Sequence, residues 1–164
     1  MPVALVLILL AALQAPPDLD TCDLVWHTPG GDAAGSVPLG NGELGVNAWV
    51  EAGGDLLLLL SRNDSFSEAC RLLKIGRVRL TLDPPLVTAA GFTQTLHLRE
   101  GVLLLDYAGG HLEVFVETER PVVRIRGTLD TPRRARLTTE IWRDQRHRLQ
   151  GGEQPERQED LGVR

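Results

Sequence analysis

The stretch FTQTLHLREGVLLLDYAGGHLEVFVETERPVVRIRGT, residues 92–128, decides the fold class of this 164-residue chain. Apolar and polar side chains alternate along it, as they do in β-strands with one buried face. Glu100-Gly101 and Gly109-Gly110 are suited to two-residue hairpin loops. Leu98 would then face Leu103, and Tyr107 would face Leu112. This register predicts one wholly apolar face, made of Leu96, Leu98, Leu103, Leu105, Tyr107, Leu112, Val114 and Val116.

The opposite face of this meander is mostly polar, and a slip of one residue would destroy the separation. It holds His97, Arg99, Asp106, Glu113 and Glu117, with Val102, Leu104 and Phe115 among them. A loop at Glu119-Arg120 would set Arg126 opposite Glu113, which is a favourable cross-strand pair, and would put Val123 and Ile125 on the core face. Downstream, Ala135, Leu137, Thr139 and Ile141 supply a further apolar row. The pattern predicts antiparallel sheet throughout, with a second sheet or a neighbouring domain over the cluster of Val102, Leu104, Phe115 and Trp142.

The preceding segment continues the strand pattern. Residues 46–50 have strand composition, and Gly53-Gly54 is suited to a hairpin that leads into residues 55–61. The five consecutive leucines there favour a strand buried on both faces. Residues 77–82 alternate polar and apolar, as expected of a half-buried strand.

One short helix is predicted between these strands. Ser65 and Glu68 match a capping box, residues 69–73 continue the helix, and Gly76 would end it. Asp64 and Glu68 would lie on one helix face, where paired carboxylates could perform acid–base chemistry on a glycosidic bond. Helix capping is the favoured interpretation of both acids, since anions stabilise helix N-termini.

The chain ends suggest export and a tail. Residues 3–13 are an unbroken apolar run, too short to span a bilayer and suited to the core of a signal peptide cleaved near Ala15. An uncleaved anchor or a buried strand is the alternative. We therefore expect a signal peptide over residues 1–15, a β-sandwich over 18–142, a polar linker or tail over 143–164, and a secreted or periplasmic protein with no stable membrane span. Cys22 and Cys70 could pair in that compartment, but need not.

Composition and motifs exclude several functions. A net charge of -5 argues against nucleic-acid binding. The four histidines lack metal-binding spacing, no G-x-S-x-G elbow is present, and Gly40-Asn41-Gly42 lacks the Lys of a phosphate loop. We expect no metal, no cofactor and no catalytic residue, and interpret Gly40-Asn41-Gly42 first as a tight turn.

Three segments carry a family resemblance. GSVPLGNGELGV (residues 35–46), SRNDSFSE (61–68) and GRVRL (76–80) are similar to motifs of the N-terminal domain of family 95 glycoside hydrolases. The chain most resembles an uncharacterised branch of these domains, known as a domain of unknown function. The resemblance implies an all-β, antiparallel, supersandwich-like β-sandwich. In such relatives an (α/α)6 barrel follows and holds the catalytic acid and base.

A chain of 164 residues cannot contain that barrel, so the resemblance implies an accessory N-terminal domain of a secreted glycoside-hydrolase-like protein, inactive alone. Its partner would be a downstream or separate (α/α)6 catalytic domain, and carbohydrate is a further candidate ligand. The matching loop residues, expected to contact the barrel or substrate, are Gly40, Asn41, Gly42, Glu43, Asn63, Asp64 and Ser65. A free-standing carbohydrate-binding module that uses Trp49 or Trp142 is the alternative. A self-contained hydrolase that uses Asp64 and Glu68 is a third hypothesis, and the resemblance alone leaves open whether this chain is an enzyme.

Overall fold

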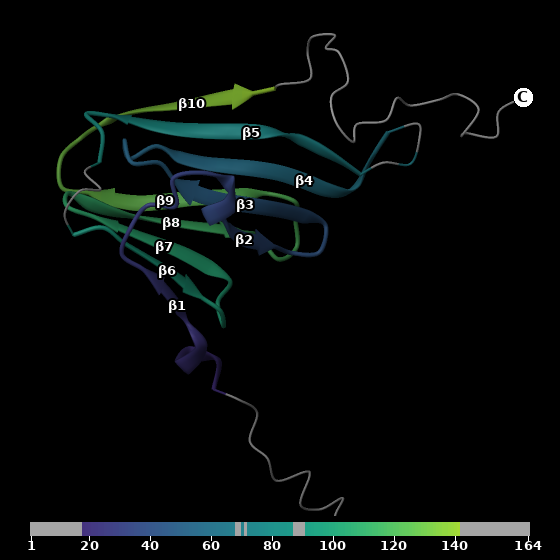
Figure 1. Cartoon of the computed structure of the whole chain (residues 1–164), viewed down its shortest axis with the longest axis horizontal. Coiled ribbons are helices and arrows are strands. Elements are labelled where there is room, and N and C mark those ends of the chain that lie inside the picture. Colours follow the sequence, from purple (N-terminus) through teal and green to yellow (C-terminus); the bar gives the residue numbers. More distant parts are fainter. Residues whose placement is uncertain (1–17, 68–69, 71, 87–90, 142–164) are drawn as a thin grey trace, which may run out of the picture.

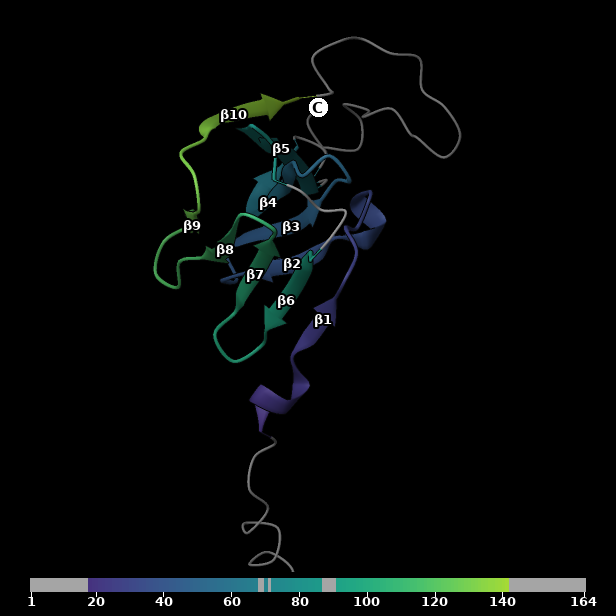
Figure 2. The same ribbon diagram turned by 90° about the vertical axis from the view of Figure 1, so that its left-hand side faces the viewer.

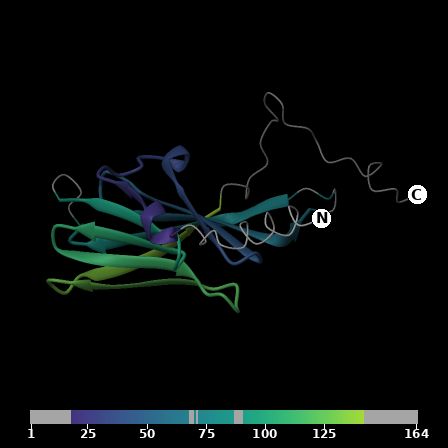
Figure 3. The ribbon, with the colours of Figure 1, turned by 90° about the horizontal axis from the view of Figure 1, so that it is seen from below.

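The computed structural model describes residues 18–67, 70, 72–86 and 91–141. Within this part of the chain, two five-stranded antiparallel sheets pack face to face (Figures 1 and 3). The first sheet has the order β1 (Leu24–Trp26), β6 (Thr93–His97), β7 (Val102–Tyr107), β8 (Gly110–Val116) and β9 (Val123–Leu129). The second has the order β10 (Arg134–Glu140), β5 (Leu72–Asp83), β4 (Leu56–Phe66), β3 (Leu44–Val50) and β2 (Val37–Gly40). The predicted antiparallel β-sandwich is confirmed.

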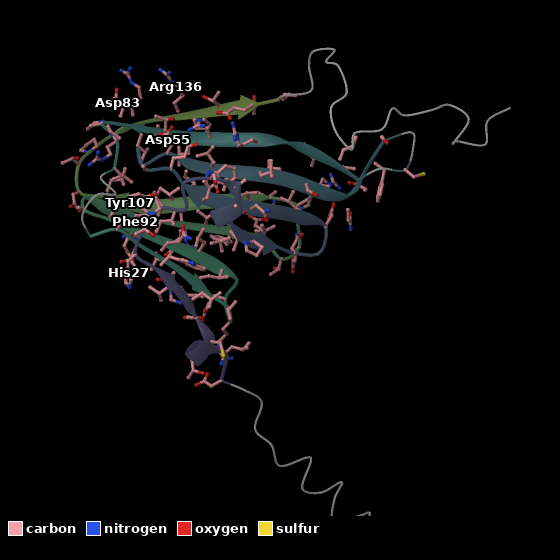
Figure 4. All side chains as sticks on the ribbon, in the orientation of Figure 1. His27, Asp55, Asp83, Phe92, Tyr107 and Arg136 are labelled. Carbon is pink, nitrogen blue, oxygen red and sulfur yellow. The ribbon has the colours of Figure 1, made fainter. Side chains whose placement is uncertain are left out.

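The core lies between the two sheets and is drawn from both. Leu103, Leu105 and Val114 of the first sheet are fully buried, as are Ala48 and Val50 of the second. At one end Phe92 and Tyr107 pack edge to face, with ring centroids 5.3 Å apart (Figure 4). Every residue of the predicted apolar face is buried except Leu98. The alternation of the meander therefore identified the core of the first sheet.

The hairpin loops differ from the prediction by two residues. Leu103 pairs with Leu96 and not with Leu98, and Leu112 pairs with Leu105. Leu98 consequently falls in the loop before Gly101, where it is exposed. A shift of two residues keeps every side chain on its predicted face, so the apolar pattern could not detect it. The predicted opposition of Glu113 and Arg126 is confirmed, and the two side chains form an ion pair.

The second sheet contains the leucine-rich strand. Its hairpin with β3 turns through Gly53 and Gly54, as predicted. Leu56, Leu57 and Leu58 of β4 are buried on both faces, and β4 continues to Phe66. Strand β2 lies across β7 and β8 of the other sheet, which brings the start of the second sheet over the centre of the first.

The predicted helix at residues 65–73 is wrong. Ser65 and Phe66 belong to β4, Cys70 has a left-handed backbone with φ of 56°, and Leu72 begins β5. Phe66 pairs with Leu72 across the hairpin, and Gly76 lies within β5 rather than ending a helix. So short a helix is marginal on its own. Here the sheet supplies backbone hydrogen bonds that the local capping signal cannot outweigh.

Short helical turns occur elsewhere, in the segment that precedes β2. The described residues contain the 3-10 turns η1 (Leu19–Cys22) and η2 (Ala33–Gly35). Asp32 caps η2, because its carboxylate accepts hydrogen bonds from the backbone N–H groups of Ala34 and Gly35. Strand β1, between the two turns, is an edge strand of three residues and was not predicted. It lies at the opposite end of the molecule from β10 (Figure 2).

Several sequence-based predictions lie outside the described residues. They are the signal peptide over residues 1–15, the tail over 143–164, and the side chains of Glu68 and Trp142. Val102, Leu104 and Phe115 are described, and they are half-buried on the face turned away from the second sheet. The second sheet packs on the opposite face, so of the two alternatives for this cluster the second sheet is wrong and a neighbouring domain stays a prediction. The apolar row of Ala135, Leu137, Thr139 and Ile141 is exposed and not part of the core.

Candidate functional site

The β2–β3 turn is built around Asn41. Its side-chain oxygen accepts hydrogen bonds from the backbone N–H groups of Glu43 and Leu44, at 3.0 and 2.8 Å. Its own backbone N–H donates to the carbonyl oxygen of Leu44, and Gly42 adopts φ of 90°. Asn is suited to this place because its short amide can bond the backbone a few residues ahead. The turn predicted for Gly40-Asn41-Gly42 is thus held by its central side chain.

The same asparagine ties this turn to the other sheet. Its amide nitrogen donates to the carbonyl oxygens of Glu117 and Arg120, at 2.8 and 3.0 Å. Both carbonyls belong to the connection between β8 and β9. Asn41 therefore uses both side-chain donors and its acceptor oxygen, and it locks the two sheets together at one end of the sandwich.

The far part of β4 runs beside this turn. The backbone N–H of Asn63 donates to the carbonyl of Glu43 at 3.0 Å, and its side-chain amide donates to the carbonyl of Gly42 at 3.1 Å. The guanidinium of Arg62 bridges two carboxylates, those of Glu43 at 2.5 Å and Asp64 at 3.1 Å. The two loop segments expected to belong together from the sequence are therefore in direct contact.

A hollow of about 270 Å³ opens between these segments on the surface. It is lined by Gly40, Gly42, Glu43, Leu44, Gly45, Ser61, Arg62 and Asn63. Four of the predicted site residues line it, whereas Asn41, Asp64 and Ser65 do not. Asn41 lies behind the turn and bonds to the other sheet. Asp64 is exposed beside Arg62, and Ser65 lies further along β4. Arg62, which sequence reasoning passed over, joins the two segments together with Asn63.

A second, more apolar hollow of about 390 Å³ adjoins the first. Its lining comprises Pro38, Leu39, Gly45, Val46, Asn47, Leu59, Ser61 and Leu73. The two hollows share Gly45 and Ser61, so they lie side by side over β2, β3 and β4. We call the two hollows and their rim of Glu43, Arg62 and Asp64 the docking face. Small residues at its centre leave the apolar floor accessible.

A separate charged cluster covers the outer face of the second sheet. The Arg79 guanidinium lies 2.7 Å from Glu51, 3.0 Å from Asp55 and 2.7 Å from Glu140. Its hydrogen bonds, the one with Glu51 foremost, raise the pKa of Arg79. The hydrogen bond with Arg79 in turn lowers the pKa of Glu140, with a further contribution from Arg77. The cluster joins the β3–β4 turn to β10.

Trp49 lies beneath this outer surface and is only 2% exposed. Arg77 lies over its ring at 6.0 Å, and Gly30 of the segment before η2 packs against its Cβ position. A buried ring cannot stack on a sugar, so Trp49 does not serve the carbohydrate-binding role considered for it. Trp142, the other aromatic considered, lies outside the described residues.

Other predicted groups are accounted for structurally. His97 Nδ1 lies 2.7 Å from a carboxylate oxygen of Asp23, whose other oxygen accepts from the backbone N–H of Leu98. That backbone hydrogen bond, followed by the one with His97, lowers the pKa of Asp23. Cys22 and Cys70 are both exposed and free. Within residues 18–141, as far as they are described, no three His, Cys, Asp or Glu side chains are grouped to hold a metal ion. No helix in the described residues is long and apolar enough to cross a bilayer.

The fold and the site define a β-sandwich with a polar-rimmed, apolar depression at one end of its second sheet. A family model described as "Domain of unknown function (DUF5703)" matches residues 25–163. The chain belongs to this family. No curated protein matches this chain.

Replacing Asn41 with alanine should lower the free energy of unfolding by about 2 kcal/mol, because the backbone groups that it pairs are left without partners. Urea denaturation followed by circular dichroism measures the change. Asn41→Asp retains the acceptor towards Glu43 and Leu44 but loses the donor towards Glu117 and Arg120. Its second carboxylate oxygen would face these two carbonyl oxygens without a hydrogen between them, so this variant should be destabilised at least as much as Asn41→Ala. If both variants match wild type, Asn41 does not lock the sheets together.

Proposed function

We propose that the chain is the accessory N-terminal domain of a secreted glycoside-hydrolase-like protein, inactive alone, that packs against an (α/α)6 catalytic barrel through the docking face. The observation that carries the proposal is the pre-formed depression lined by the Gly40–Glu43 turn and residues 61–63. Interfaces commonly combine an apolar centre with a polar rim, and the apolar floor beside the Glu43–Arg62–Asp64 rim has that arrangement. The kind of partner comes from the resemblance of these loops to family 95 glycoside hydrolases.

The rim is better suited to contact than to hydrolysis. Glycosidases place two carboxyl groups on either side of the scissile bond, with free space between them. Here the Arg62 guanidinium occupies the space between Glu43 and Asp64 and bonds to both. A substrate bond cannot enter between them without displacing the arginine.

Rigidity also favours a docking role. The turn is fixed by the bonds of Asn41, and the neighbouring strand is fixed by those of Asn63. A surface that is ordered before its partner arrives loses little conformational freedom on binding. The exposed carboxylates of Glu43 and Asp64 leave this rim acidic, so we expect a complementary basic residue on the barrel.

The test uses a barrel encoded in the same reading frame or in a neighbouring gene, co-expressed as a separate chain. The two should co-purify. The double charge reversal Glu43→Lys/Asp64→Lys should weaken their association at least tenfold, because each lysine would face the basic residue of the partner. Glu100→Lys, in the exposed β6–β7 loop, is the matched control and should leave binding unchanged.

Three results would overturn the proposal. They are an association that is insensitive to the double reversal, the lack of any barrel-coding sequence at the locus, and glycosidase activity in the purified chain. Binding of oligosaccharides by the isolated chain, abolished by the double reversal, would instead identify a free-standing carbohydrate-binding module.

A further inference from the structure

Strand β10 is an edge strand with a free side. It pairs with β5 along its whole length, from Arg134 opposite Asp83 to Glu140 opposite Arg77. It lies at one end of the order of its sheet, and no other described strand pairs with it. Its outer side therefore presents backbone N–H and C=O groups to further pairing.

The inner face of this edge is apolar and uncovered. Leu137 pairs with Leu80, so both side chains point to the core side of the sheet. Leu80 is 8% exposed, whereas Leu137 is 65% exposed. Proteins commonly protect such edges with an inward-pointing charge. Here the inward-pointing residues of β10 are Ala135, Leu137 and Thr139, none of which is charged.

The sequence of β10 is self-complementary. If a second copy runs antiparallel with Leu137 opposite its own counterpart, Arg134 of each strand meets Glu140 of the other. Ala135 then meets Thr139, and all seven residues of the strand are paired. Each carboxylate oxygen of Glu140 is already bonded to one of Arg77 and Arg79, but it keeps capacity for a further donor. A shift of two residues in one direction would place Arg136 against Arg136, and in the other it would lose the pairing of leucine with leucine.

We propose that two copies of this chain associate through their β10 strands, in antiparallel register centred on Leu137. The two five-stranded sheets would join into one continuous sheet about a two-fold axis, as in isologous dimers. The ion pair between Arg134 of one copy and Glu140 of the other would form twice. The two Leu137 side chains would shield each other from water. Arg136, at the outer rim of the sandwich (Figure 4), would face Thr138 of the other copy. The docking face uses strands at the other side of this sheet, so either proposal can fail without the other.

Sedimentation velocity of the full chain tests the association. An edge-strand contact belongs to the small interface class, so we expect a dimer that forms with rising concentration between about 10 and 500 µM. Leu137→Lys should weaken it at least tenfold, because two lysines would meet on the axis. Leu98→Lys, at an exposed leucine beside the first sheet, is the matched control and should dimerise like wild type. A monomer throughout this range, or a dimer unaffected by Leu137→Lys, overturns the proposal.

Charge reversals and single cysteines test the register. Arg134→Glu should also abolish the dimer, since it sets a second carboxylate against that of Glu140, whereas Arg136→Glu faces a threonine and should change the affinity less than threefold.

In a background with Cys22 and Cys70 replaced by serine, Leu137→Cys should cross-link to itself on mild oxidation, because directly opposed cross-strand Cα atoms are within disulfide range. Thr138→Cys and Thr139→Cys should not. Cross-linking of Thr138→Cys without Leu137→Cys would refute the proposed register.

Discussion

Replacing Gly54 with alanine should lower the free energy of unfolding by about 4 kcal/mol, because the added methyl group has no room. Gly54 lies in the β3–β4 turn at φ of 91°, a backbone conformation that side chains disfavour. A Cβ there would lie 2.3 Å from the carbonyl oxygen of Leu86. Leu86 is buried in the core, so its backbone cannot withdraw without disturbing the packing.

Gly53 provides a matched control in the same turn. A Cβ at this position meets nothing within 4 Å, and the backbone is not left-handed. Gly53→Ala should therefore change the stability by less than about 0.5 kcal/mol. Urea unfolding of the two variants under identical conditions measures the difference. Equal stabilities would mean that the contact between Gly54 and Leu86 does not constrain the fold.

The alternation of residues 92–128 was sufficient to predict which face of β6, β7 and β8 is buried, because burial of one face fixes which side chains point inward. It could not fix the loops, since a two-residue shift leaves the faces unchanged. Leu98 shows the consequence. Its place in the alternation matches the apolar face, but it lies beyond the end of β6 and is exposed. The Arg126–Glu113 pair was predictable because the loop between β8 and β9 was placed correctly.

The predicted helix failed for a different reason. The capping box at Ser65 is a local signal, whereas the pairing of Phe66 with Leu72 depends on two strands meeting in a hairpin. Local preference is worth only a fraction of a kcal/mol per residue, and tertiary pairing can override it. The sequence pattern could not predict that Leu137 is exposed, because an apolar row indicates a face but not whether a second sheet covers it.

The candidate site was predicted in part. The family resemblance assigned the Gly40–Glu43 turn and the Asn63–Ser65 segment to one set of loops, and two hydrogen bonds from Asn63 join them. It could not distinguish Asn41, which bonds behind the turn, from Glu43, which lines the hollow. The bond of Asn41 to the carbonyl of Arg120 spans 79 positions, and no local pattern encodes that contact. Arg62 stood inside the motif two residues before Asp64, but its contact with Glu43 depends on the pairing of β3 with β4.

Replacing Arg79 with methionine should lower the free energy of unfolding by about 3 kcal/mol at neutral pH. Arg79 holds the carboxylates of Glu51, Asp55 and Glu140 around one guanidinium. Methionine retains much of the apolar stem but removes the shared cation from Glu51 and Asp55 and leaves Glu140 with Arg77 alone, in a partly buried site. Removing one partner of such a network is far more costly than the net value of the ion pairs, because the remaining charges lose their compensation.

Acidification should reduce the difference in the free energy of unfolding between wild type and Arg79→Met. In wild type, the hydrogen bond from Arg79 keeps the pKa of Glu140 below its ordinary value of 4.5. A lowered carboxyl pKa stabilises the folded state above the unfolded pKa, and that stabilisation is lost as the pH falls through the folded value. Arg79→Met lacks this contribution, so acidification removes less stability from it than from wild type. The difference in unfolding free energy should therefore shrink steadily between pH 7 and about pH 3.

Arg126→Met separates this network effect from an ordinary surface ion pair. Arg126 pairs with Glu113, but its side chain is 68% exposed. Exposed pairs contribute about 0–1 kcal/mol, so this variant should stay within about 1 kcal/mol of wild type at every pH. Urea unfolding of wild type and both variants at pH 7, 5 and 3 makes the comparison. If Arg79→Met is less stable than wild type by the same amount at every pH, its loss of stability arises from packing of the side-chain stem, because packing does not titrate. If it is less stable only at neutral pH, the cause is its lost charge pairing with the three carboxylates.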